Sequence, residues 1–182
     1  TSLFNMLRRA PEDAVAPVKM LKFSEYVHGL HVPTSLNLVR ILPLRGTGLV
    51  VLDPKFVFAV VDNFFGGIGR SAKIEGREFT ATETRVIHML LKHVFADVKE
   101  AWSHVARLDI EYLNSEINPH FGNIVSPTEI VVVTSFHIEL DGGGGDLHVT
   151  MPYSMIEPMR ELLDAGVASD RVEHDERWMH AL

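Results

Sequence analysis

Residues 46–54, Gly-Thr-Gly-Leu-Val-Val-Leu-Asp-Pro, carry the pattern on which the fold depends. A glycine turn is followed by a short apolar strand and then by Asp53-Pro54. This pair is typical of a helix start, because aspartate can cap the first turn and the first helical position needs no N–H donor. Residues 144–152, Gly-Gly-Asp-Leu-His-Val-Thr-Met-Pro, repeat the plan, and Gly46 and Pro54 each recur 98 positions later as Gly144 and Pro152.

The segments around the two turns extend the repeat. Alternating apolar residues predict a strand over 36–44, and a second long strand is expected over 130–140. The predicted core face of this second strand consists of Ile130, Val132, Thr134, Phe136, Ile138 and Leu140. We therefore expect an α/β fold: a pseudo-two-fold duplicated, three-layer α/β/α domain in which both halves share one sheet. The alternative is that any hairpin followed by a helix resembles this pattern.

The rest of the chain gives signals of unequal strength. Thr80-Ala81-Thr82-Glu83 has the form of a capping box and precedes a broad apolar stripe, which predicts a long helix. A strand is expected over 108–117, and residues 141–145 are expected to form a glycine-rich hairpin turn. Residues 18–30 fit a helix or a strand. Short helices are predicted over 2–9 and from Asp170 onward, and a loop is predicted around Pro11 and Pro17.

Composition excludes several classes of function. The chain of 182 residues has no cysteine, which excludes disulfides and thiolate metal sites and is typical of a reducing cytoplasm. A net charge of −7 without a dense Lys/Arg run argues against nucleic-acid binding. No apolar stretch approaches the roughly 18 residues of a membrane span, so we expect no membrane insertion. Both ends of the chain suggest a piece of a longer protein.

Motifs for catalysis or cofactor binding are missing from the sequence. His28 and His31 could share a helix face, but no His-Glu-x-x-His motif accompanies them, and His88 and His93 point differently on a helix. The ten histidines are interpreted as surface residues, with a metal hydrolase as a weak alternative. No nucleophile elbow and no phosphate-binding loop is present. We therefore predict no metal, no cofactor and no catalytic residue.

The glycine cluster at 66–69, Gly-Gly-Ile-Gly, allows two interpretations. Glycine tolerates positive φ, so the cluster can simply end the helix that begins at Pro54. Alternatively, three positions without side chains expose the backbone to a partner. Phe64, Phe65 and Ile68 would then supply the apolar anchors that dominate interface energies.

Four stretches of the sequence together indicate a known family: FAVVDNFFGGIG at 58–69, KEAW at 99–102, SEINPHFGNIVSPTEIVVVTSF at 115–136, and MPY with IEP at 151–158. They resemble the middle domain of the FliM family of flagellar motor switch proteins. The resemblance covers nearly the whole chain. It implies an N-terminal helix and linker over 1–17, the middle domain over 18–166, and a C-terminal helix over 167–182 that leads to a FliN-like domain. His120 departs from the family, which more often has an amide there.

The resemblance also implies partners and a site. It implies a fold similar to the CheC and CheX phosphatases, and a binding site for the rotor protein FliG at Asn63, Phe65, Gly66, Gly67, Ile68, Gly69 and Arg70. Neighbouring FliM copies, FliN and phosphorylated CheY are the other expected partners, in a ring at the cytoplasmic side of the inner membrane. The main CheY-docking peptide of the family lies in a segment that this chain lacks.

A CheC-like phosphatase acting on phosphorylated CheY is the alternative function. Such enzymes place an Asn three residues after a Glu on a helix. Here Val86 follows Glu83 at that spacing and Ser103 follows Glu100, so neither position matches. We therefore expect a non-catalytic switch component.

Overall fold

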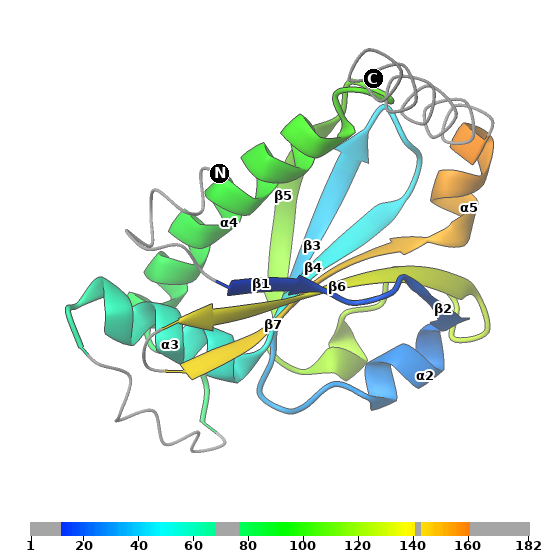
Figure 1. Ribbon diagram of the computed structural model, residues 1–182. Coiled ribbons are helices and arrows are strands. Elements are labelled where there is room, and N and C mark those ends of the chain that lie inside the picture. Colours follow the sequence, from blue (N-terminus) through cyan, green and yellow to red (C-terminus); the bar gives the residue numbers. More distant parts are fainter. Residues whose placement is uncertain (1–11, 68–76, 141–142, 161–182) are drawn as a thin grey trace, which may run out of the picture.

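The computed structural model describes residues 12–67, 77–140 and 143–160, with the backbone alone described for 12–15. Seven strands form one antiparallel sheet in the order β1-β6-β7-β4-β3-β5, and β2 also pairs with β6. The strands are β1 (Glu12–Val15), β2 (Lys19–Lys22), β3 (Ser35–Leu42), β4 (Thr47–Leu52), β5 (Asp109–Glu116), β6 (Ile130–Leu140) and β7 (Gly143–Pro152). The sheet is strongly twisted (Figure 1).

Helices lie on both faces of the sheet, as the α/β/α prediction requires. They are α2 (Phe23–His28), α3 (Pro54–Phe64), α4 (Ala81–Trp102) and α5 (Tyr153–Ile156), with short 3-10 turns η1 (Pro119–Phe121) and η2 (Glu157–Met159). One apolar core joins α3, α4 and Met155 of α5 to one face of the sheet. A second, smaller core joins α2 to the other face. Figure 1 shows α2 and α4 lying on different sides of the sheet.

The strand order confirms the predicted duplication, because equivalent strands lie at equal distances from the centre of the sheet. β7 corresponds to β4, β6 to β3, and β1 to β5. The central strands β4 and β7 pair around Val50 and Val149, which lie directly opposite each other. The outer strands match as well: Ile41 pairs with Ile110 in one half, and Ile138 pairs with Asp13 in the other. A pseudo-two-fold axis perpendicular to the sheet therefore passes through the Val50–Val149 pair.

The residue equivalence within the duplication differs from the constant spacing of 98. Leu49 lies in the α2-side core, whereas Leu147, which is 98 positions later, lies in the opposite core. A shift of one residue in a strand moves a side chain to the other face. Equivalent residues of β4 and β7 are 99 apart, and those of β3 and β6 are 97 apart. The reason is that four residues connect β3 to β4, while only residues 141–142 connect β6 to β7.

Most of the predicted elements are present. The predicted long helix is α4, and it begins with the expected capping box: Glu83 N–H donates to Thr80 Oγ1, and Thr80 N–H donates to the Glu83 carboxylate. The ambiguous stretch over 18–30 contains both a strand, β2, and a helix, α2. The loop predicted around Pro11 and Pro17 is wrong in part, because β1 occupies Glu12–Val15 and pairs with β6. The helices predicted over 2–9 and from Asp170 lie outside the described residues.

The predicted core face of β6 is wrong at the start of the strand. Val131 and Val133 are buried against α2, whereas Ile130 is 38% exposed. Further along, Ile138 and Leu140 are buried against the opposite helices, as predicted. Because different helices cover the two faces along this strand, a single alternating face cannot describe its burial.

The glycine-rich segment is also more than a turn. Gly143, Gly144 and Gly145 belong to β7, and residues 141–142 lie outside the described residues. A Cβ on Gly145 would come within 2.5–2.9 Å of the backbone and Cβ of Phe56. Gly145 therefore allows the first turn of α3 to pack directly on the sheet, which fixes the position of this helix.

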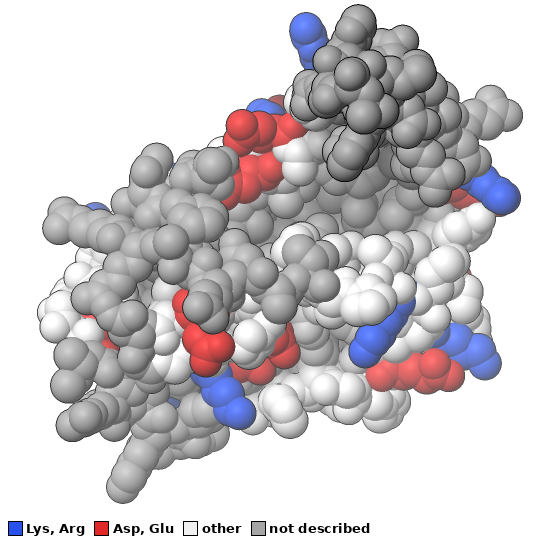
Figure 2. Space-filling model, viewed as in Figure 1, with Lys and Arg blue, Asp and Glu red and all other residues white. Residues whose placement is uncertain are grey.

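Charge is dispersed on the face shown in Figure 2. Among the described residues, Lys/Arg and Asp/Glu side chains lie close to one another, with uncharged residues between the groups. The described acidic side chains therefore do not form one broad patch in this view. None of the described helices combines the length and the apolarity that crossing a membrane requires.

Candidate functional site at the end of α3

The candidate site lies at the C-terminal end of α3, a helix whose start and buried face hold it firmly. Asp53 Oδ1 accepts a hydrogen bond of 2.6 Å from Lys55 N–H, and Pro54 occupies the first turn. Phe56, Val57 and Val60 are fully buried against the sheet and α4. The helix starts where the Asp53-Pro54 pair predicted. Its cap and its buried face anchor it, so the C-terminal end has a defined position.

Gly66 ends the helix. Its φ of +79° is left-handed, a conformation that L-residues with side chains adopt only under strain. Gly66 N–H donates to Asn63 O at 3.0 Å, and Gly67 N–H donates to Asp62 O at 2.8 Å. These two bonds form a Schellman motif, which satisfies carbonyls at the helix end. The helix-stop interpretation of the glycine cluster is therefore confirmed.

Two phenylalanines at this end are exposed. Phe64 is 49% exposed and Phe65 is 65% exposed. Their rings are in T-shaped contact, with centroids 5.4 Å apart and an interplanar angle of 83°. Among the described residues, no atom lies within 4 Å of the position that a Cβ on Gly66 would take. An apolar pair thus stands beside open backbone at the surface of the protein.

The structure brings four of the predicted site residues together within about one helical turn: Asn63, Phe65, Gly66 and Gly67. Ile68, Gly69 and Arg70 lie outside the described residues. The described part of the candidate site is therefore a helix terminus with two aromatic side chains.

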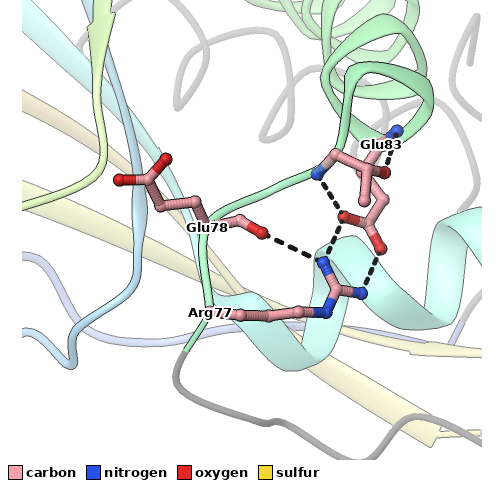
Figure 3. Close-up of polar contacts among 4 residues, drawn as sticks. Arg77, Glu78 and Glu83 are labelled. Carbon is pink, nitrogen blue, oxygen red and sulfur yellow. Dashed lines mark hydrogen bonds and ion pairs between the residues drawn. The ribbon is translucent and has the colours of Figure 1, made fainter.

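The chain that returns to α4 is fastened by residues that the sequence analysis did not single out for this role. Arg77 forms two hydrogen bonds with the Glu83 carboxylate, of 2.8 and 2.9 Å, and a third of 3.0 Å with Glu78 O (Figure 3). Its guanidinium lies 5.3 Å from the ring centroid of Phe58 on α3, and Phe79 packs beside the same ring. The start of α4 is thereby tied to α3.

Glu83 has an unusual charge environment as a result. It is 7% exposed, and its hydrogen bonds with Arg77, followed by those with Thr80, outweigh the effect of burial and lower the pKa of the carboxyl from 4.5 to about 2. The capping box was evident from Thr80 and Glu83. No motif pointed to Arg77, whose partner is set only by the path of the chain between α3 and α4.

The described residues that were considered for a metal site or a phosphatase site do not form one. Within the described ranges, no three His, Asp or Glu side chains are grouped to hold a metal ion. Glu83, the first candidate for a phosphatase carboxylate, is engaged by Arg77 and Thr80. On the α2 side, His148 is half-buried, which lowers its pKa, and its Nδ1 lies 3.3 Å from the hydroxyl of buried Tyr26.

Comparison with known proteins identifies relatives over the whole chain. The family described as "Flagellar motor switch protein FliM" matches residues 1–167. FliM of Pseudomonas aeruginosa is 65% identical over 181 residues, covering all of this chain and 56% of the relative. FliM of Escherichia coli is 46% identical over 97% of this chain and 53% of the relative. The chain thus spans about half the length of these curated relatives.

Solved structures agree with this match. The FliM middle domain of Vibrio alginolyticus is 59% identical with a TM-score of 0.81, covering 88% of this chain and 90% of that one. A FliG–FliM complex from H. pylori matches at 27% identity and a TM-score of 0.80, covering 86% of each chain. A CheC-like protein from Shewanella, 11% identical with a TM-score of 0.50 over 82% of this chain and 91% of that one, shares the fold alone. The chain belongs to the FliM family of flagellar motor switch proteins.

Proposed function

We propose that this chain is a non-catalytic binding domain of the flagellar motor switch and that it contacts FliG through the end of α3. The contact would comprise Asn63, Phe65, Gly66, Gly67, Ile68, Gly69 and Arg70. One observation carries the proposal: Phe65 is 65% exposed directly beside the left-handed backbone of Gly66. A FliG–FliM complex in the same family, from H. pylori, supports FliG as the partner.

The physical case rests on the cost of exposing an aromatic side chain. Burial of a phenylalanine in an interface contributes roughly 1.5–3 kcal/mol, which corresponds to about tenfold to more than a hundredfold in affinity. The Schellman hydrogen bonds and the buried face of α3 hold the helix end in place before a partner binds. Less conformational freedom is then lost on association, which favours binding.

Titration of the chain with the middle domain of FliG, followed by calorimetry, tests the proposal. Phe65→Ala is expected to weaken the complex at least tenfold while leaving the circular dichroism and the unfolding midpoint unchanged. Phe121→Ala is the matched control, because Phe121 is equally exposed, at 67%, but lies on η1 in a different part of the fold. Equal affinities of the two variants, or no binding by the unaltered chain at about 100 μM, would contradict the proposal.

We infer the wider role from membership of the family. Side-by-side copies of the chain would form a ring at the cytoplasmic side of the inner membrane, next to FliN. Phosphorylated CheY would change the direction of rotation through this ring. Because β1 pairs within the sheet, we place the start of the folded domain near Glu12 rather than at residue 18.

The absence of catalysis is part of the proposal and has its own test. Phosphorylated CheY incubated with the chain is expected to lose its phosphoryl group at the spontaneous rate. Faster loss would favour the CheC-like phosphatase, for which the shared fold is the supporting observation. A Glu83→Gln variant would then show whether that carboxylate takes part.

A further inference from the structure

Two histidines that are distant in sequence lie together on the α2 side of the molecule. His28 is in the last turn of α2, and His120 is the middle residue of η1. Their rings are in edge contact, with centroids 5.8 Å apart at 81°. Both side chains are exposed. The sequence suggested a pairing of His28 with His31, whereas the fold supplies His120 as the neighbour.

The tautomer of His28 is fixed by a hydrogen bond. Its Nδ1 lies 2.6 Å from the carbonyl oxygen of Ser24, so Nδ1 must carry the proton and donate it. The lone pair is therefore on Nε2. A histidine whose other nitrogen donates to a backbone carbonyl is the usual form of a metal ligand, because the bond orients the ring and raises its basicity. Within the described part of the chain, neither Nε2 of His28 nor the ring of His120 has a hydrogen-bond partner.

The backbones that carry the two rings are well held. Phe23, Tyr26 and Val27 bury the opposite side of α2. At η1, Pro119 is buried and Asn118 Oδ1 accepts a hydrogen bond of 3.0 Å from His120 N–H. Two imidazoles bound to one metal ion at about 2.1 Å have ring centroids about 5–6 Å apart, and the observed separation of 5.8 Å lies in this range.

We propose that His28 and His120 form a two-histidine site for a divalent transition-metal ion such as Zn²⁺, Ni²⁺ or Cu²⁺. Water would complete the coordination, because no third His, Asp or Glu joins the pair among the described residues. Such a site binds reversibly, and the bound ion bridges α2 to η1. Imidazole ligands favour these ions over Mg²⁺ and Ca²⁺.

Calorimetric titration with ZnCl₂ and with NiCl₂, on the chain without an affinity tag at pH 7.5, tests the proposal. His28→Ala and His120→Asn are each expected to reduce the affinity at least tenfold. His88→Ala should leave it unchanged, since His88 is also exposed and in edge contact with an aromatic ring, that of Tyr112.

A second readout separates metal binding from ring contact alone. In NMR spectra, added Zn²⁺ should shift the ring protons of His28 and His120 together in the unaltered chain. Circular dichroism confirms that the variants are folded. Retention of full affinity by the double variant, or no binding by the unaltered chain, would overturn the proposal. A loss of stability in the variants without any effect on metal affinity would show ring contact alone, and would overturn it as well.

Discussion

Replacement of Glu83 by glutamine should destabilise the fold in a way that depends on pH. Glu83→Gln keeps the shape of the side chain and an oxygen that can accept from Thr80 N–H, but it removes the charge paired with Arg77. A carboxyl whose pKa falls from 4.5 to about 2 on folding contributes about 3 kcal/mol at neutral pH. Arg77 is partly exposed, so solvent screening reduces the expected loss to about 2–3 kcal/mol.

The sign follows from the direction of the pKa change. A carboxyl with a lowered pKa in the folded state stabilises the protein above its unfolded pKa, and this contribution is lost as the pH falls from about 4.5 toward 2. The unaltered chain and Glu83→Gln should therefore differ most at pH 7 and converge as the pH falls through about 2. In urea unfolding followed by circular dichroism, the midpoint should fall at pH 7 while the slope stays the same.

Glu78→Gln provides the matched control, because the neighbouring Glu78 is exposed and contributes only its backbone carbonyl to Arg77. Its stability at pH 7 should stay within about 0.5 kcal/mol of the unaltered chain. If Glu83→Gln were equally stable at pH 7, or if its deficit were the same at pH 7 and pH 3, the ion pair would not be the source of the stability and the argument would fail.

Two further predictions concern β7. Gly145→Ala should destabilise the chain by at least about 2 kcal/mol in urea unfolding, because the new Cβ would overlap the backbone of α3. Gly29→Ala is the control and should be close to neutral, because its Cβ would meet its nearest neighbour at 3.4 Å. A similar loss of stability in both variants would contradict the packing argument. His137 Nδ1 lies 2.7 Å from Asp146 Oδ1, which raises the pKa of the imidazole above 6.5. An NMR titration should show this raised pKa and its fall in Asp146→Asn, while a titration that is unchanged by the substitution would exclude the pairing.

The duplication shows what sequence spacing can and cannot establish. Gly46, Gly144, Pro54 and Pro152 revealed two copies of one plan, because turns and helix starts depend on local chemistry. They could not reveal which residues are equivalent. The connections between the paired strands differ by two residues, so the equivalence shifts from 97 to 99 across the turn. A mean spacing of 98 conceals this shift and assigns residues to the wrong face.

Local signals predicted the candidate site better than they predicted long-range packing. Asp53-Pro54 begins α3 and Gly66 ends it, as expected, because a cap and a left-handed residue each act within one helical turn. The packing role of Gly145 was not predicted, since a glycine in a glycine-rich run looks like part of a flexible turn. Its close approach to α3 depends on the angle at which the helix crosses β7, which no local pattern encodes.

The candidate site is presented by a helix that is anchored at its start and in its middle, which would hold the proposed contact in place before a partner binds. At the start of α3, Gly145 admits close contact with the sheet. In its middle, Phe58 packs against Arg77, which is itself held by Glu83. The terminus must then absorb the change of chain direction, and Gly66 does so without a side chain. The conformation that ends the helix thus also leaves open backbone beside Phe65, so the proposed binding surface would result from the same constraint that terminates α3.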